Sequence, residues 1–162
     1  FDFDDSDERD KNIDNMHYSE GDKVDAKTFM QNEGLDEDLI YDLELNLEEL
    51  RKNTGFYMYV SQEYLEYYKV TLKGMINIFE FSYEFKNLAT SFRSLYQFLD
   101  NLDIDNLDKE KSEFLKNMLD LIYEDVRKWF EEVILNQTAQ DIHYLDASLL
   151  ANVGQIKIMI GN

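Results

Sequence analysis

Residues 109–135, KEKSEFLKNMLDLIYEDVRKWFEEVIL, form the longest run of helical periodicity in this chain of 162 residues. Apolar side chains return every three or four positions, a spacing that places them on one face of an α-helix. We therefore expect an amphipathic helix from about Lys109 to Leu135, with its apolar face against a core. The predicted stripe consists of Phe114, Leu115, Met118, Leu121, Ile122, Val126, Trp129, Phe130 and Val133.

Similar stripes precede and follow this helix. They lie within residues 35–50 and 61–100 before it, and within residues 138–160 after it. Gly55 follows the basic residues of RKNTG and marks the end of the first segment. Spacing leaves open whether residues 61–100 form one helix or two helices with a break near Ser82. The stripes consist of Leu39, Leu43, Leu47 and Leu50, then Tyr64, Leu65, Tyr68, Leu72, Met75, Ile76 and Phe79, then Phe85, Leu88, Ala89, Phe92, Leu95, Tyr96 and Leu99, and finally Ile142, Leu145, Leu149, Val153, Ile156 and Ile160.

Composition favours helices over strands. The chain has no proline and only six glycines, which favours long helices and disfavours a turn-rich β fold. The most β-prone stretch, GFYMYVSQEY at residues 55–64, is short and isolated. The last segment is expected to begin near Thr138, whose hydroxyl could cap the helix together with Asp141 three residues on. These segments predict an all-α fold, an antiparallel four- or five-helix bundle over residues 35–162.

An acidic leader precedes the predicted bundle. The net charge of the chain is −19, and residues 1–50 alone hold 18 acids and 4 bases. Residues 1–30 carry little apolar periodicity, so we expect a disordered acidic linker there. Because the chain begins at Phe1 and not at a methionine, we also expect it to be a fragment of a longer protein.

The same composition excludes several classes of site and partner. The chain has no cysteine and two histidines, so thiolate sites and histidine-rich di-iron sites are not available. Neither a glycine-rich phosphate loop nor a calcium-loop motif occurs, and we expect no metal and no other cofactor. An acidic surface repels phosphate, which argues against nucleic acid as a partner. No apolar run is long enough for a membrane span and no signal-peptide pattern is present, so we expect a cytoplasmic protein.

Aromatic residues are concentrated in FYMYVSQEYLEYY, residues 56–68. Such rings can fill the core of a wide bundle, with their hydroxyl groups at its rim. They can also form a binding surface for a partner, because tyrosine suits interfaces. The sequence leaves both interpretations open.

The stretch QDIHYLDASLL, residues 140–150, holds the main candidate for a chemical site. On a helix, His143 would lie on the flank of the apolar stripe and be partly exposed. Asp146, three residues on, could hydrogen-bond the imidazole ring and raise its pKa. The candidate site is therefore a phospho-acceptor His143 with Asp146 and Asp141 beside it.

This stretch resembles the motif of histidine phosphotransfer (HPt) domains, helical bundles that display one histidine within H-x-L-K-G-x-x-x-x-x-x-G. In HYLDASLLANVG, His143 takes the phospho-acceptor position, Leu145 matches the leucine, Ala147 is the small residue, and Gly154 falls near the distal glycine. The motif lysine is replaced by Asp146, which would repel a phosphoryl group. The resemblance implies a bundle that exchanges phosphate with a receiver domain.

Two further resemblances concern the same kind of signalling. AQDIHYL resembles the helix of chemotaxis phosphatases of the CheZ type, which use an Asp-x-x-x-Gln pair; here Asp141 takes the acid position and Leu145 the amide position. SYEFKNLATS resembles the H-E-x-x-N region of sensor-kinase dimerisation helices through Glu84 and Asn87, with Tyr83 in the place of the histidine.

The sequence as a whole predicts a non-enzymatic helical signalling module, HPt-like in shape. Its expected partner is a receiver-type or other protein in bacterial signal transduction. One alternative is a structural or oligomerisation bundle without phosphate chemistry, including a homodimer. Another is a CheZ-like auxiliary phosphatase that acts on a response regulator through Asp141. No complete catalytic signature is present, so enzymatic activity is not the primary expectation.

Overall fold

The computed structural model describes residues 23–54 and 58–161. This part of the chain is predominantly helical and contains no strand, which confirms the predicted all-α fold. The helices are α2 (Ala26–Asn32), α3 (Glu37–Thr54), α4 (Gln62–Phe79), α5 (Lys86–Asp100), α6 (Lys109–Trp129) and α7 (Asp146–Ile160). Short 3-10 turns occupy Tyr83–Phe85 and Ile104–Asn106, and a π-helical segment, Phe130–Leu135, extends α6.

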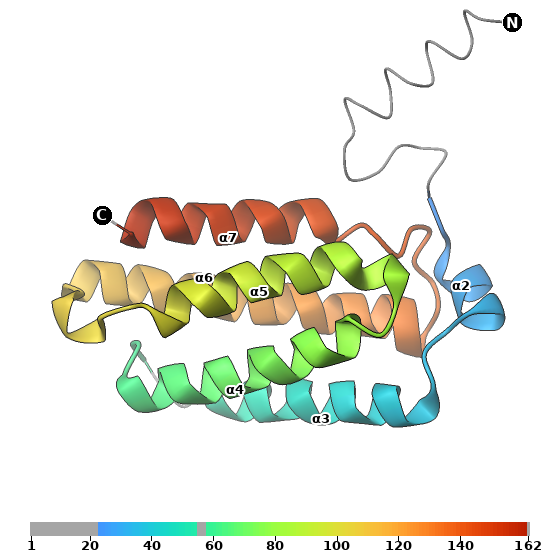
Figure 1. The fold of residues 1–162 in the computed structure, drawn as a ribbon, viewed down its shortest axis with the longest axis horizontal. Coiled ribbons are helices and arrows are strands. Elements are labelled where there is room, and N and C mark those ends of the chain that lie inside the picture. Colours follow the sequence, from blue (N-terminus) through green and yellow to red (C-terminus); the bar gives the residue numbers. More distant parts are fainter. Residues whose placement is uncertain (1–22, 55–57, 162) are drawn as a thin grey trace, which may run out of the picture.

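The five long helices, α3 to α7, form an antiparallel bundle (Figure 1). Each runs opposite to the helix before it, because the connections between them are short. Helices α3 and α4 form one side, α5 and α6 lie in the middle, and α7 covers the opposite side, where it contacts both α5 and α6. None of the described helices combines the length and the apolar character needed to cross a membrane.

Residues 61–100 form two helices. Ser61 caps α4, since its hydroxyl oxygen accepts a hydrogen bond from the Tyr64 amide at 3.1 Å. The chain leaves the helical path at Ser82, whose backbone is extended (φ −121°, ψ 129°). Phe85 is then buried beneath the 3-10 turn, so the break between α4 and α5 is anchored in the core.

The predicted stripes supply most of the core. All members of the stripes on α4 and on the last segment are buried, whereas Leu39 and Tyr96 are only partly buried. On α6 the prediction is wrong for Leu121, which is 45% exposed, while Leu119 and Tyr123 are buried. Helix α6 contacts α3 as well as α7, so its buried face is wider than the spacing of its apolar residues indicated.

The aromatic stretch divides between core and surface. Tyr64 and Tyr68 are buried, and the Tyr68 hydroxyl donates a hydrogen bond to the Leu119 carbonyl at 2.8 Å. Tyr59 and Tyr67 are exposed. Phe56 and Tyr57 lie outside the described residues. The core interpretation is therefore confirmed for Tyr64 and Tyr68, whereas Tyr59 and Tyr67 are available at the surface.

A cluster of aromatic rings joins five parts of the chain. Phe79 of α4 packs against Phe85, Phe92 and Trp129, with ring centroids 5.6–5.8 Å apart. Phe85 also packs against Phe29 of α2 at 5.2 Å. Packed aromatic pairs contribute beyond their buried area. The cluster therefore fixes the α4–α5 turn, α2 and the end of α6 relative to one another.

The prediction of a disordered linker over residues 1–30 is wrong for its last residues, which belong to helix α2. Residues 1–22 lie outside the described part, but Ala26–Asn32 form α2, where Ala26 and Phe29 are fully buried. Asp25 caps this helix by accepting from the Thr28 amide at 2.8 Å. Three apolar residues in a seven-residue helix give too weak a periodic signal to predict it. The burial of Ala26 and Phe29 against the bundle stabilises this helix.

Candidate functional site

His143 lies in the connection between α6 and α7 and not within a helix. The sequence predicted a helix from near Thr138, and this prediction is wrong: α7 begins at Asp146, and residues 138–145 form bends and turns. Gln137 adopts a left-handed backbone conformation with φ 55°, which interrupts any helical continuation from the π-helical end of α6.

The backbone of this connection is bonded to other segments. The Ile142 amide donates to the Val24 carbonyl at 2.7 Å, and the Ile142 carbonyl accepts from Trp129 Nε1 at 2.9 Å. The His143 amide donates to Asp141 Oδ1 at 3.0 Å. Because these groups have partners outside the helical pattern, residues 141–145 make turns and place His143 beside the α4–α5 turn.

The structure brings His143 together with Asp146 and two residues of the α4–α5 turn. His143 Nε2 lies 3.1 Å from Glu84 Oε1, and Nδ1 lies 3.5 Å from Asp146 Oδ2. Asn87 Nδ2 donates to the same Asp146 oxygen at 3.3 Å. We refer to His143, Glu84, Asn87, Asp141 and Asp146 as the His143 cluster. It joins the start of α7 to the start of α5.

The electrostatics of the cluster favour the imidazolium form of His143. Its pKa is raised above the ordinary value of 6.5, first because the Asp146 carboxylate acts as a hydrogen-bonding partner of the ring, while partial burial opposes this effect. The charges of Asp146, Glu84 and Asp141 add to the rise in pKa. The predicted effect of Asp146 on the His143 pKa is thus confirmed in direction.

The His143 side chain is more enclosed than the flank position predicted. It is 12% exposed, and both ring nitrogens have carboxylate neighbours. A phospho-accepting histidine needs an accessible nitrogen, and a phosphoryl group placed here would meet carboxylate oxygens at close range. The geometry suits a charged link between two parts of the bundle better than phosphate transfer.

The residues that suggested a chemotaxis phosphatase and a sensor-kinase helix have structural roles in the bundle. Asp141 is buried, with one carboxylate oxygen bonded to the His143 amide, and Leu145 is buried as well. Neither side chain projects from the surface as an acid–amide pair would need to. Glu84 and Asn87, which suggested a sensor-kinase helix, instead belong to the His143 cluster. Sequence spacing could not place them there, because they lie 59 residues from their partners.

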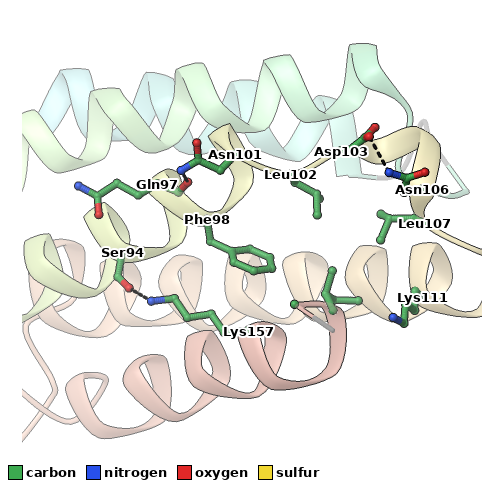
Figure 2. A pocket seen from close by; sticks show the side chains of 12 residues that line it. Ser94, Gln97, Phe98, Asn101, Leu102, Asp103, Asn106, Leu107, Lys111 and Lys157 are labelled. Atoms are coloured by element: carbon green, nitrogen blue, oxygen red, sulfur yellow. Dashed lines mark hydrogen bonds between the residues drawn. The ribbon is translucent and has the colours of Figure 1, made fainter.

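A pocket of about 480 Å³ lies at the opposite end of α7, between the end of α5, the following loop and the start of α6 (Figure 2). Phe98 and Leu102 form part of its wall, and Lys157 donates a hydrogen bond to the Ser94 hydroxyl. Asp103 is the one carboxylate among the 12 lining residues, which include no histidine. The pocket can accept a small polar molecule but lacks a paired acid and base.

A second accessible feature lies on the outer side of α3 and α4. A shallow groove of about 390 Å³ runs between these helices and is formed chiefly by Leu45 and Asn46 on α3 and by Gly74, Asn77 and Phe81 on and just after α4; we call it the outer groove. Gly74 allows the two helices to approach, because a Cβ atom there would lie 2.5 Å from the Asn46 side-chain oxygen.

Large apolar side chains are exposed at the outer groove and beside it: Leu45 and Phe81 line it, and Val70 lies one turn before Gly74 on α4. Phe81 is 75% exposed and Val70 is 70% exposed, and Leu45 is also exposed. Val70, Phe81 and Leu45 belong to none of the predicted stripes, and spacing along the chain does not show that apolar residues outside a stripe lie together at one surface. The detectable signal was a second set of apolar residues on α4 that falls outside the buried stripe.

Neither feature has the composition of a metal site. Within residues 23–54 and 58–161, no group of three or more histidine or carboxylate side chains has an arrangement suited to holding a metal ion.

Comparison with models of known protein families, with curated protein sequences and with solved structures returns no match for this chain.

Proposed function

We propose that this chain is a non-enzymatic helical interaction module that docks a protein partner in signal transduction. The observation that carries this proposal is the set of exposed apolar side chains at the outer groove: Leu45 and Phe81 line it, and Val70 lies one turn before Gly74 on α4. Large apolar side chains that gather in solvent on a charged protein are typical of a protein–protein contact.

The choice of a receiver domain as the partner rests on the resemblance of HYLDASLLANVG to the HPt motif. Phosphotransfer through His143 is the less favoured form of this idea, because Nε2 lies 3.1 Å from Glu84 Oε1 and the side chain is largely buried. A docking role does not need an accessible imidazole. We therefore assign the His143 cluster to holding the fold and the outer groove to binding.

The proposal is tested by photo-crosslinking in the cells that make the protein. A photoreactive amino acid placed at Val70 is expected to capture a defined protein, which mass spectrometry identifies. The matched control is Ile158 on α7, which is exposed to the same extent, 70%, on the opposite side of the bundle. The same set of captured proteins from both positions, or none from Val70, contradicts the proposal.

The role of His143 is tested in the same experiment. We expect His143→Gln to leave capture at Val70 unchanged, because the cluster lies at the α5–α7 end and not in the outer groove. Loss of capture at Val70 in a folded His143→Gln protein would show that the His143 imidazole is needed for partner binding.

A further inference from the structure

The outward side of α4 carries a continuous strip of positions at coiled-coil spacing. Tyr67, Val70, Gly74 and Asn77 follow one another at intervals of three and four residues, which places them in one line along α4, and Phe81 follows at the same spacing in the turn after the helix. Val70 and Phe81 are the most exposed side chains of this line. The opposite side of α4 is buried in the bundle. Helix α3 approaches the strip at Gly74, where Asn46 lies against it, while Val70 and Phe81 on either side of this contact stay exposed.

The α3 side of the groove is strongly acidic. Helix α3 holds six acids and two bases, and the bases are already paired: Arg51 with Glu48 at 2.6 Å and Lys52 with Glu49 at 3.6 Å. Four acids of α3 have no basic partner among the described residues. Of these, Asp42 lines the groove and Asp38 lies one helical turn before it on the same face, whereas Glu37 and Glu44 lie on the other side of α3. Lys73, at the far edge of α4, is the exposed base nearest the strip in sequence.

We propose that the outer groove binds a basic amphipathic helix of the partner protein. Its apolar side chains would pack against Val70, Leu45 and Phe81, and its lysine or arginine side chains would face Asp38 and Asp42 of α3. Tyr67 to Asn77 spans 10 residue steps of α4, or about 15 Å at 1.5 Å per residue, and Phe81 extends the strip into the turn after the helix. A partner helix of about four turns matches this length, and helix-in-groove contacts of this kind use anchors every three or four residues.

The acidic charge of α3 favours a basic helix in the groove over a second copy of the chain and over the chain's own residues 1–22. A second copy of the chain would bring the acids of one α3 against those of another, which is unfavourable. The chain's own residues 1–22 hold nine acids and two bases, so they too are repelled by this surface. A basic segment gains both the apolar contact and the opposite charge.

The inference rests on the proposed function and adds the chemistry of the partner. Its direct test uses the full chain and a fluorescent 21-residue peptide with leucine at the a and d positions of each heptad and lysine elsewhere. Binding is followed by fluorescence anisotropy at 0.15 M salt. We expect the peptide to bind, and Val70→Asp to weaken the affinity at least about tenfold, as loss of one buried aliphatic contact implies.

Matched variants separate a groove from general attraction to an acidic protein. Ile158→Asp makes the same change at an equally exposed position on α7 and is expected to change the affinity less than about twofold. Asp42→Lys is expected to weaken binding more than Asp105→Lys, which changes the net charge equally in the α5–α6 loop. Phe81→Asp, beyond the end of α4, is a second variant of the apolar strip in case Val70→Asp does not fold.

Several results would overturn the inference. Absence of binding is one, and equal binding of a scrambled peptide of the same composition is another. Equal loss in Val70→Asp and Ile158→Asp would show non-specific attraction. Self-association of the wild-type chain that Val70→Asp abolishes, measured by sedimentation, would identify a second copy as the occupant. If crosslinking at Val70 still captures one partner through a segment that is not basic, the docking function stands and only this inference fails.

Discussion

His143 stands between carboxylates from two distant parts of the chain, Glu84 in the α4–α5 turn and Asp146 at the start of α7. When the ring is protonated, each contact is a charge-assisted interaction in a largely enclosed place, where screening by water is weak. When the ring is neutral, Asp141, Asp146 and Glu84 lose the positive charge between them. The residue therefore links the folded state to pH.

The first residue-scale prediction concerns this linkage. Because the folded-state pKa of His143 lies above 6.5, its stabilising effect is complete below that pH and is lost as the pH rises through the folded-state pKa. The free energy of unfolding of wild type should exceed that of His143→Gln most at pH 6, and the difference should narrow by pH 8.5. Urea denaturation of both proteins at these pH values measures it. A difference that grows with pH would contradict the assignment.

At the scale of single elements, local polar contacts decide where the helices begin. Asp25, Ser61 and Asp108 each accept a backbone amide at the first turn of α2, α4 and α6. The end of α6 is set differently, by a π-helical segment followed by Gln137 at φ 55°. Caps of this kind are visible in the sequence, whereas a π-helical segment is not.

The cap of α6 can be tested by mutation. Asp108 Oδ1 accepts from the Lys111 amide at 2.8 Å. Asp108→Ala should lower the free energy of unfolding by about 1 kcal/mol, the usual cost of losing an N-cap. Asp105→Ala removes a carboxylate from the same loop without removing the cap and should have a smaller effect. Equal effects of the two variants would assign the loss to charge and not to capping.

At the scale of the whole molecule, a ring cluster and backbone hydrogen bonds close one end of the bundle. The Ala26 amide donates to the Ala139 carbonyl at 2.9 Å, and the Ile142 amide donates to the Val24 carbonyl at 2.7 Å. Phe29 fills the space above Phe85. The position of His143 depends on this closure, since the same backbone that binds residues 24–26 carries the imidazole.

Removing one ring tests this dependence. Phe29→Ala should lower the stability of the closed end by about 3–5 kcal/mol, the usual cost for a buried phenylalanine. Hydrogen exchange at the Ile142 amide should accelerate more than exchange at Leu72, in the middle of α4, because α2 can detach without unfolding the bundle. Phe81→Ala removes an exposed ring and should leave both amides protected. Equal acceleration at Ile142 and Leu72 would mean that α2 and the bundle unfold together.

The sequence by itself determined the all-α fold, the α4 and α7 stripes, and the start of the second helical segment near residue 61. These features depend on neighbours within one helical turn, which the order of residues specifies directly. It also paired His143 with Asp146, because the two are close along the chain.

Only the tertiary structure decided that α7 begins at Asp146, that α2 packs on the bundle, and that Glu84 meets His143. Each of these depends on a backbone or side-chain group finding a partner far away in sequence, as Ile142 does with Val24. Leu121 was misplaced for a related reason: the width of a buried face depends on how many helices pack around it. The outer groove is also decided only by the tertiary structure. Whether an apolar residue is exposed depends on which helices cover it, and the sequence does not specify their positions.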